Sequence, residues 1–151
     1  HFAAREGHEA VLNSLLTHRA HVHDAVLRGN CRGATALHSA AVGGHAEAAQ
    51  FLVCARADVA RQLTSTALKG AQPLHCMRDG GNVELVRVLL EARADISARQ
   101  HNGLFSGGQP LHMACVDGLN VVSTLLEARA DPAAAVTACP LRGLQCLHLA
   151  S

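Results

Sequence analysis

The stretch QPLHCMRDGGNVELVRVLLEARADI, residues 72–96, holds the pattern that decides the fold. It begins with Pro73-Leu74-His75, passes two glycines, and continues with apolar residues at helical spacing up to Leu89-Leu90. Proline fits the first turn of a helix and a glycine pair marks a turn, so the stretch predicts a short helix, a turn and a longer helix. The Leu-His pair recurs at spacings of 37, 37 and 36 residues: Leu37-His38, Leu74-His75, Leu111-His112 and Leu147-His148.

A second motif repeats in step with the first. Ala-Arg-Ala-Asp occurs at 55–58, 92–95 and 128–131, and a degenerate copy, His-Arg-Ala-His, occurs at 18–21. Self-similarity at a fixed period of this length is typical of a solenoid of stacked repeats. His1 lies 37 residues before His38 and the last copy is cut short, so we expect a piece of a longer chain. The copies of this single array are expected at about 1–32, 33–69, 70–106, 107–142 and, in part, 143–151.

The composition fits helices packed at close range. The chain is 49% hydrophobic but only 2% aromatic, so the core must consist mainly of Leu, Val and Ala. Apolar periodicity predicts helix pairs in successive copies, beginning with helices at about 1–6, 9–18, 37–43 and 46–54. The segments between the copies lack this period and contain glycine, which predicts loops at 22–36, 59–70 and 132–142.

The repeated pattern G-x-[TQ]-[PAC]-L-H, followed in most copies by x-A-[AC]-x-x-G and then by L-L-E-A-R-A-D, resembles the ankyrin repeat. That family has a unit of a β-turn and two antiparallel helices, a period of about 33 residues and a T-P-L-H-x-A signature. The resemblance covers nearly the whole chain. It implies an all-α fold, a helix-turn-helix solenoid with β-hairpin or loop fingers, and the spacing described next predicts that these fingers are extended.

The chain departs from the family pattern in two ways. The interval from Asp to Gly is 12 residues in every copy, as from Asp58 to Gly70, which lengthens each finger and explains the longer period. In addition, one Arg per copy takes the place where the family has a C-capping Gly: Arg19, Arg56, Arg93 and Arg129. A residue other than Gly is disfavoured at positive φ, so either these Arg accept strain or the turn differs.

The Arg column has two interpretations. It lies at helix C-termini, where positive charge complements the helix dipole. An acid follows two residues later in three copies, so the column is either a solubilising edge with local ion pairs or a row that docks an acidic surface or phosphate groups. The acids are Asp58, Asp95 and Asp131.

Net charge, hydropathy and cysteine spacing argue against a nucleic-acid partner, a transmembrane segment and an oxidising compartment. A net charge of +1 gives no reason to expect nucleic acid. No apolar run reaches 18 residues, so we expect no transmembrane segment. No Cys-x2-Cys pair occurs, and Cys54, Cys76 and Cys115 fall in predicted helices as small hydrophobes. We therefore expect free thiols and an intracellular, reducing compartment, the cytoplasm or an organelle interior.

Histidines are numerous, but no chemistry is expected of them. No acid or nucleophile accompanies the Leu-His histidines at a regular offset, so we expect no catalytic site, no cofactor and no enzyme activity. The one metal-like cluster occurs in a single copy and is expected to be ordinary loop: His18, His21, His23 and Asp24. The resemblance implies that the repeated histidines are structural and bond backbone near the turns: His38, His75, His112 and His148.

The fingers are the candidate contact surface, because their sequences differ while the framework repeats. Apolar residues on a finger indicate either a partner contact or a finger that folds onto its neighbour and buries them. The resemblance adds positions on the inner helices that line the concave side. The candidate partner-binding residues are Leu63, Thr64, Arg78, Asp79, His101, Leu104, Phe105, Val116, Asp117, Leu141 and Arg142.

Three functions remain open from the sequence. The first is a non-enzymatic module that binds one or more protein partners through its concave surface and fingers. The second is a structural accessory subunit, permanently bound in a large multi-protein assembly at a membrane or elsewhere. The third is a regulatory segment of an enzyme or channel. Neither end of the chain carries a polar capping face, which favours a longer chain or a partner that covers both ends.

Overall fold

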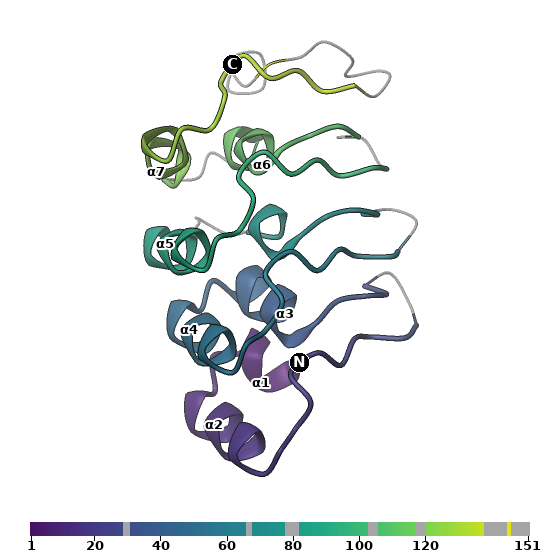
Figure 1. Ribbon diagram of the computed structural model, residues 1–151, viewed down its shortest axis with the longest axis vertical. Helices are drawn as coiled ribbons and strands as arrows, with labels where there is room; N and C mark the ends of the chain where they lie inside the picture. The colour runs from purple at the N-terminus through teal and green to yellow at the C-terminus, as the bar shows by residue number, and fades with distance from the viewer. Residues whose placement is uncertain are drawn as a thin grey trace.

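The chain forms two columns of helices and a third column of projecting loops, the fingers (Figure 1). The computed structural model describes residues 1–28, 31–65, 68–77, 82–102, 106–116, 120–137 and 145. The inner column contains α1 (Phe2–Arg5), α3 (Ala36–Gly43), the 3-10 turn η1 (Pro73–His75) and α6 (Pro110–Val116). The outer column contains α2 (Glu9–Thr17), α4 (Ala46–Cys54), α5 (Val83–Glu91) and α7 (Val122–Glu127). Helices contact their counterparts in adjacent repeats as well as their pair partners, so the predicted solenoid is confirmed.

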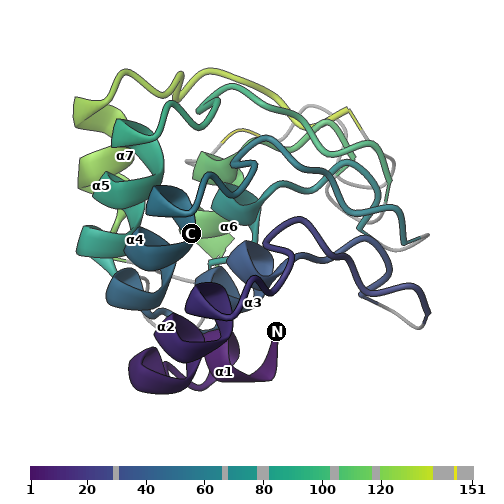
Figure 2. The ribbon, with the colours of Figure 1, turned by 60° about the horizontal axis from the view of Figure 1, so that its bottom comes forward.

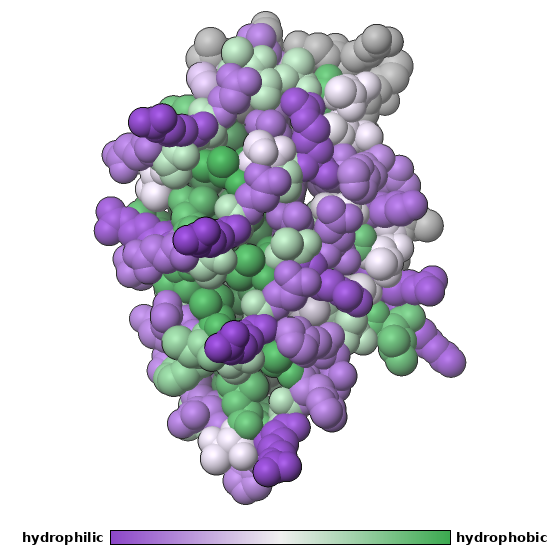
Figure 3. Space-filling view, in the orientation of Figure 1, coloured by the Kyte–Doolittle hydropathy of each residue, from purple (hydrophilic) through white to green (hydrophobic). Residues whose placement is uncertain are grey.

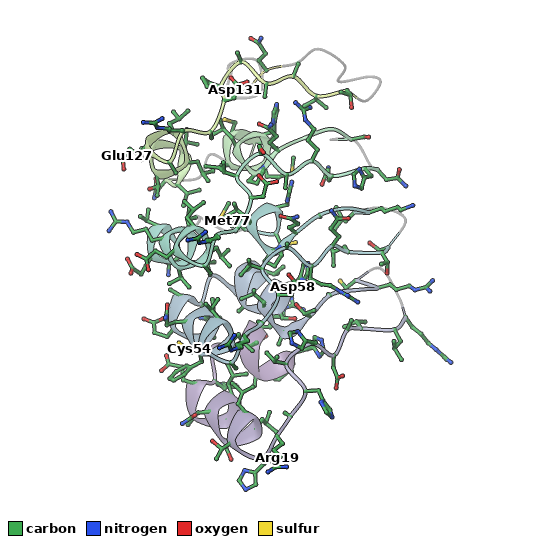
Figure 4. The ribbon with its side chains drawn as sticks, viewed as in Figure 1. Arg19, Cys54, Asp58, Met77, Glu127 and Asp131 are labelled. Carbon is green, nitrogen blue, oxygen red and sulfur yellow. The ribbon has the colours of Figure 1, made fainter. Side chains whose placement is uncertain are left out.

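The helices of the first two repeats lie within two residues of the predicted bounds. The third repeat differs, because its inner element within the described residues is a single turn, and Met77 after it is buried in the core (Figure 4). Cys76 and Cys115 are half-buried. Cys54 lies in a helix as predicted, at the end of α4, but it is exposed. The described cysteines, including Cys31, are free thiols.

The core runs the length of the stack and is built from the Leu, Val and Ala that the composition predicts. Each inner element after α1 places the Leu of Leu-His in it, and each outer helix after α2 adds a Leu at the equivalent position. These six leucines are at most 1% exposed: Leu37, Leu74 and Leu111 inside, and Leu52, Leu89 and Leu125 outside. Repeats are also tied by polar contacts, as where Asn82 caps α5 and its side-chain amide donates to the Gly44 carbonyl at 3.0 Å.

Each of the first three fingers is an extended loop closed at its base by one reciprocal backbone pair. In the first finger, Val26 N–H donates to the Ala34 carbonyl and Gly33 N–H donates back to Val26, both at 2.8 Å. The same pair recurs 37 residues on at Leu63 and 74 residues on at Gln100. No strand occurs in the described part of the fingers, so the loop form of the prediction holds rather than the β-hairpin form.

Backbone hydrogen bonds also join each finger to the next, and we call this series the finger ladder. The backbone amide of Thr64 donates to the Arg32 carbonyl at 2.9 Å, and the backbone amide of His101 donates to the Lys69 carbonyl at 2.6 Å. The backbone amide of Thr137 donates to the Ser106 carbonyl at 3.0 Å, which repeats the contact once more. Figure 2 shows the fingers stacked beside one another on the far side of the inner helices from the outer column. The fingers therefore form one connected layer rather than separate loops.

The ladder requires glycine at Gly33, and Gly33→Ala is expected to destabilise the chain by about 2–4 kcal/mol. Gly33 has φ +89°, and an added Cβ would lie 2.7 Å from the backbone nitrogen of Thr64, which cannot move away without breaking the ladder. Gly44→Ala is the matched control, because Gly44 also has a positive φ (+73°) but open space around it. It should lose only the conformational part, about 1–2 kcal/mol. Urea unfolding compares the two, and equal losses would contradict a close-packed ladder.

None of the helices in the described ranges is both long enough and apolar enough to cross a membrane.

Candidate protein-binding surface

The structure places three candidate residues in the open on the fingers and inner column. Thr64 and His101 are exposed on successive fingers, where their amides make the ladder bonds described above. Val116, the last residue of α6, is 43% exposed. These positions leave side chains free above a fixed backbone, which suits a recognition surface. Apart from Leu63, the other candidates lie outside the described residues, as does the fourth repeated histidine: Arg78, Asp79, Leu104, Phe105, Asp117, Leu141, Arg142 and His148.

Leu63, predicted to be a partner-binding residue, is buried in the structure. It is only 4% exposed and packs in a small cluster with Ala34 and Ala71, beside Val26 and Cys76. At this position the finger folds onto its neighbour and buries its apolar residue, which is the second of the two alternatives for the fingers, so Leu63 stabilises the finger layer.

Two of the repeated histidines, His75 and His112, connect their turn to the next finger. The Nδ1 of His75 accepts from the backbone amide of Gln72 in the same turn, at 3.2 Å. The proton therefore lies on Nε2, which donates to the Ala98 carbonyl at 3.0 Å. His112 makes the equivalent bonds to Gln109 and Ala134, at 3.1 and 3.0 Å. His38 accepts from the Thr35 amide, while its Nε2 makes no hydrogen bond within the described residues. Each ring therefore belongs to the framework as a neutral imidazole.

Burial keeps these rings neutral. Loss of solvation lowers the pKa of His38 from 6.5 to about 4, and nearby backbone carbonyls at Ala71 and Arg61 offset only part of this effect. Loss of solvation also lowers the pKa of His75 to about 4, and it lowers the pKa of His112 as well. Groups held neutral and bonded to backbone on both nitrogens, as His75 and His112 are, have no free atom with which to act on a substrate or bind a metal.

The Arg column adopts the strained conformation. All four residues have φ of 65–70°, in the left-handed region: Arg19, Arg56, Arg93 and Arg129. All four are exposed, and Figure 4 shows Arg19 beyond the end of α2. Of the two alternatives from the sequence, the turn keeps its left-handed residue and Arg accepts the strain. This conformation costs an L-residue about 1–2 kcal/mol, so it is a real cost at each position.

Acidic residues surround the column without pairing to it. Asp58, Asp95 and Asp131 accept from the backbone amide two residues on, at 2.8–2.9 Å, and so hold the turns that lead into the fingers. Figure 4 labels Asp58 and Asp131. No ion pair joins them to the Arg within the described ranges. Glu91 and Glu127 precede the column residues by two positions, so each guanidinium of the last two repeats has an acid on both sides along the chain. This charge balance favours a solubilising edge over a site for phosphate groups.

Arg56→Gly is expected to raise the free energy of unfolding by about 1 kcal/mol, because Gly adopts φ +65° without strain. The melting temperature should rise by roughly 2–4 °C. Arg56→Ala is the control, since it removes the same charge but keeps a Cβ at positive φ. Thermal melts of both variants decide the point, and a Gly variant no more stable than the Ala variant would contradict it.

The sequence reasoning missed the charge of the fingers. The segments 25–36 and 59–75 contain no Asp or Glu, yet they carry Arg28, Arg32, Arg61 and Lys69, all exposed. On the face seen in Figure 3, hydrophobic side chains gather over the helix columns while the finger side is mostly hydrophilic. Comparing the charges of loops and helices separately would have found this basic region.

The described residues bring no three His, Cys, Asp or Glu side chains together in a group that could hold a metal ion. The cluster His18, His21, His23 and Asp24 is wholly described, and the ring of His18 bonds the Ser14 carbonyl at 2.8 Å.

Comparison with known families agrees with this geometry. A sequence profile for ankyrin repeats in three copies matches residues 1–62 and 58–136. The comparison with curated proteins gives no match. The matched ranges span most of the sequence, and they include the helix pairs, the left-handed turns and the fingers described above. This chain therefore belongs to the ankyrin repeat family.

Proposed function

We propose that this chain is a protein-binding module that reads a partner through its finger layer and the concave side of its inner helices. Ankyrin repeats are generally non-enzymatic modules for protein–protein interaction. The observation that supports this mode of binding is the finger ladder, which fixes the backbones of successive fingers while Thr64 and His101 keep exposed side chains. A pre-ordered surface binds with a smaller entropic loss than a set of mobile loops. We also place the chain in a reducing compartment, which its free thiols favour.

One lysine makes a direct test practical. Lys69 is the only lysine in the sequence and is exposed on the second finger. A short amine-reactive crosslinker applied to a gentle lysate, followed by mass spectrometry, should join Lys69 to one recurrent partner protein. The variant Lys69→Arg keeps the charge and should lose the finger crosslinks. If no partner recurs above that control, the proposal fails.

A second function has its own supporting observation. Outer-helix residues also expose apolar side chains, which a permanent assembly would cover: Val11 (50%), Leu15 (48%), Phe51 (37%) and Leu126 (41%). Such an accessory subunit would elute within a large complex on gel filtration of the native lysate. Elution of the parent chain at its own size, with crosslinks only from the finger side, would exclude this alternative.

A further inference from the structure

A cavity opens between the inner helices and the first two fingers, and we call it the finger pocket. Its volume is about 360 Å³, within the range of ligand pockets. Phe2 of α1 and Val42 of α3 line one side, and Val26 and Leu68 of the two fingers line the other. A hollow of this size beside a fixed finger backbone can receive a large side chain from outside.

The walls and rim of the finger pocket are apolar and partly uncovered. Phe2 is 73% exposed and Leu68 is 43% exposed, although both line the cavity. Leu27, beside the lining residue Val26, is 82% exposed. Large apolar side chains left in water at the rim of a hollow gain free energy when an apolar group covers them. The chemistry of the pocket therefore fits a bulky apolar side chain.

The surroundings of the finger pocket are basic. Arg5 is among its lining residues, and four more positive charges lie on the two bordering fingers, whose segments 25–36 and 59–75 contain no acid: Arg28, Arg32, Arg61 and Lys69. The nearest acids along the chain are Glu6, beside Arg5, and Asp24 and Asp58, where the chain enters the fingers. The positive charges exceed these acids, so the rim attracts negative charge around an apolar centre.

We propose that the finger pocket binds a protein segment with one bulky apolar anchor side chain flanked by acidic residues. This inference rests on the proposed function and names the chemistry of its partner. The apolar walls select the anchor, and the basic fingers select the charge on either side of it. A nucleic acid fits less well, because its phosphates gain nothing from apolar walls and the chain as a whole carries a charge of only +1.

Synthetic peptides test both parts of this chemistry. The probe is a fluorescein-labelled peptide of alternating Asp and Glu with a central Phe, titrated in a fluorescence polarisation assay. Replacing Phe by Ala should weaken binding by at least about tenfold, and replacing the acids by Lys should do the same. Binding should also weaken as salt rises, because the charges are exposed. The absence of saturable binding, or equal binding of the Ala or Lys peptide, would overturn the proposal.

A pocket-filling variant locates the binding. Val42→Trp places a large side chain in the cavity and should weaken binding of the acidic Phe peptide by at least about tenfold. Val11→Trp is the matched control, since Val11 is 50% exposed on α2 of the outer column. This variant should bind the peptide with an affinity within about twofold of wild type. Circular dichroism checks that both variants fold. Loss of affinity in both variants, or in neither, would place the peptide elsewhere and overturn the assignment.

The native thiols give a reading that needs no mutation. Cys31 is exposed and lines the finger pocket, whereas Cys54 is exposed on the outer column. Saturating acidic Phe peptide should slow alkylation of Cys31 and leave Cys54 unchanged, as followed by peptide mass spectrometry. Equal rates at Cys31 with and without peptide would contradict binding in the pocket.

The two proposals can fail separately. If Val42→Trp retains the partner crosslinked through Lys69 while the peptide shows no binding, the pocket inference falls and the binding module stands. If no partner recurs above the Lys69→Arg control, the proposed function itself falls.

Discussion

Lowering the pH from 7 to 4 is expected to remove roughly 6 kcal/mol from the free energy of unfolding, through His38 and His75. Both have a folded pKa of about 4 against 6.5 when exposed. The unfolded chain therefore takes up protons first, and stability is lost as the pH falls between 6.5 and about 4. Each histidine contributes about 3 kcal/mol. His112 adds in the same direction, because its pKa is also lowered.

Urea unfolding at several pH values measures this effect. The contribution of the histidines to the free energy of unfolding should be nearly constant above pH 7 and should decline as the pH falls below 6.5. Below about pH 4 the histidines should cause no further loss of stability. The variant His75→Leu is the control, because it should be less stable at pH 7 but show a shallower decline. A profile of the same slope in wild type and His75→Leu would contradict the linkage.

His75→Ala is expected to cost about 3–5 kcal/mol at pH 7.5, enough to threaten a fold of ordinary stability. The ring bonds the Gln72 amide and the Ala98 carbonyl, so its loss leaves a buried donor and a buried acceptor without partners. The cavity left by the ring adds to this loss. The melting temperature should fall by about 10 °C.

A second histidine provides the matched control for this loss. His23 is exposed in the turn before the first finger, and His23→Ala should change stability by no more than about 0.5 kcal/mol. Urea unfolding of both variants in parallel separates a structural ring from a solvated one. A loss below about 1 kcal/mol for His75→Ala would show that the ring does not join its turn to the next finger.

The helices could be predicted because their signal is local. The apolar period, Pro73 and the glycine turns fix helix pairs wherever they occur, and the repeat supplies several copies of the same evidence. The outcome at the Arg column could not be predicted, because the left-handed conformation at φ 65° costs an L-residue only about 1–2 kcal/mol. A cost this small does not allow the sequence to exclude the strained turn.

The candidate site was harder to predict because it depends on contacts between repeats. Leu63 looks like an exposed loop residue until the amide of Thr64 is seen bonded to Arg32, which brings the two fingers together and buries the leucine. The finger pocket likewise needs α1, α3 and two fingers in place before it exists. The basic character of the fingers, by contrast, is present in the sequence itself.

The most direct test of partner binding through the fingers is amide hydrogen exchange on the chain with and without the partner identified through Lys69. We expect slower exchange in the inner helices and along the fingers, at peptides that contain Thr64, His101 and Val116. Peptides from α2, α4 and α5 should exchange at unchanged rates. Protection confined to the outer helices would contradict the account, because the partner would then cover the face opposite the fingers.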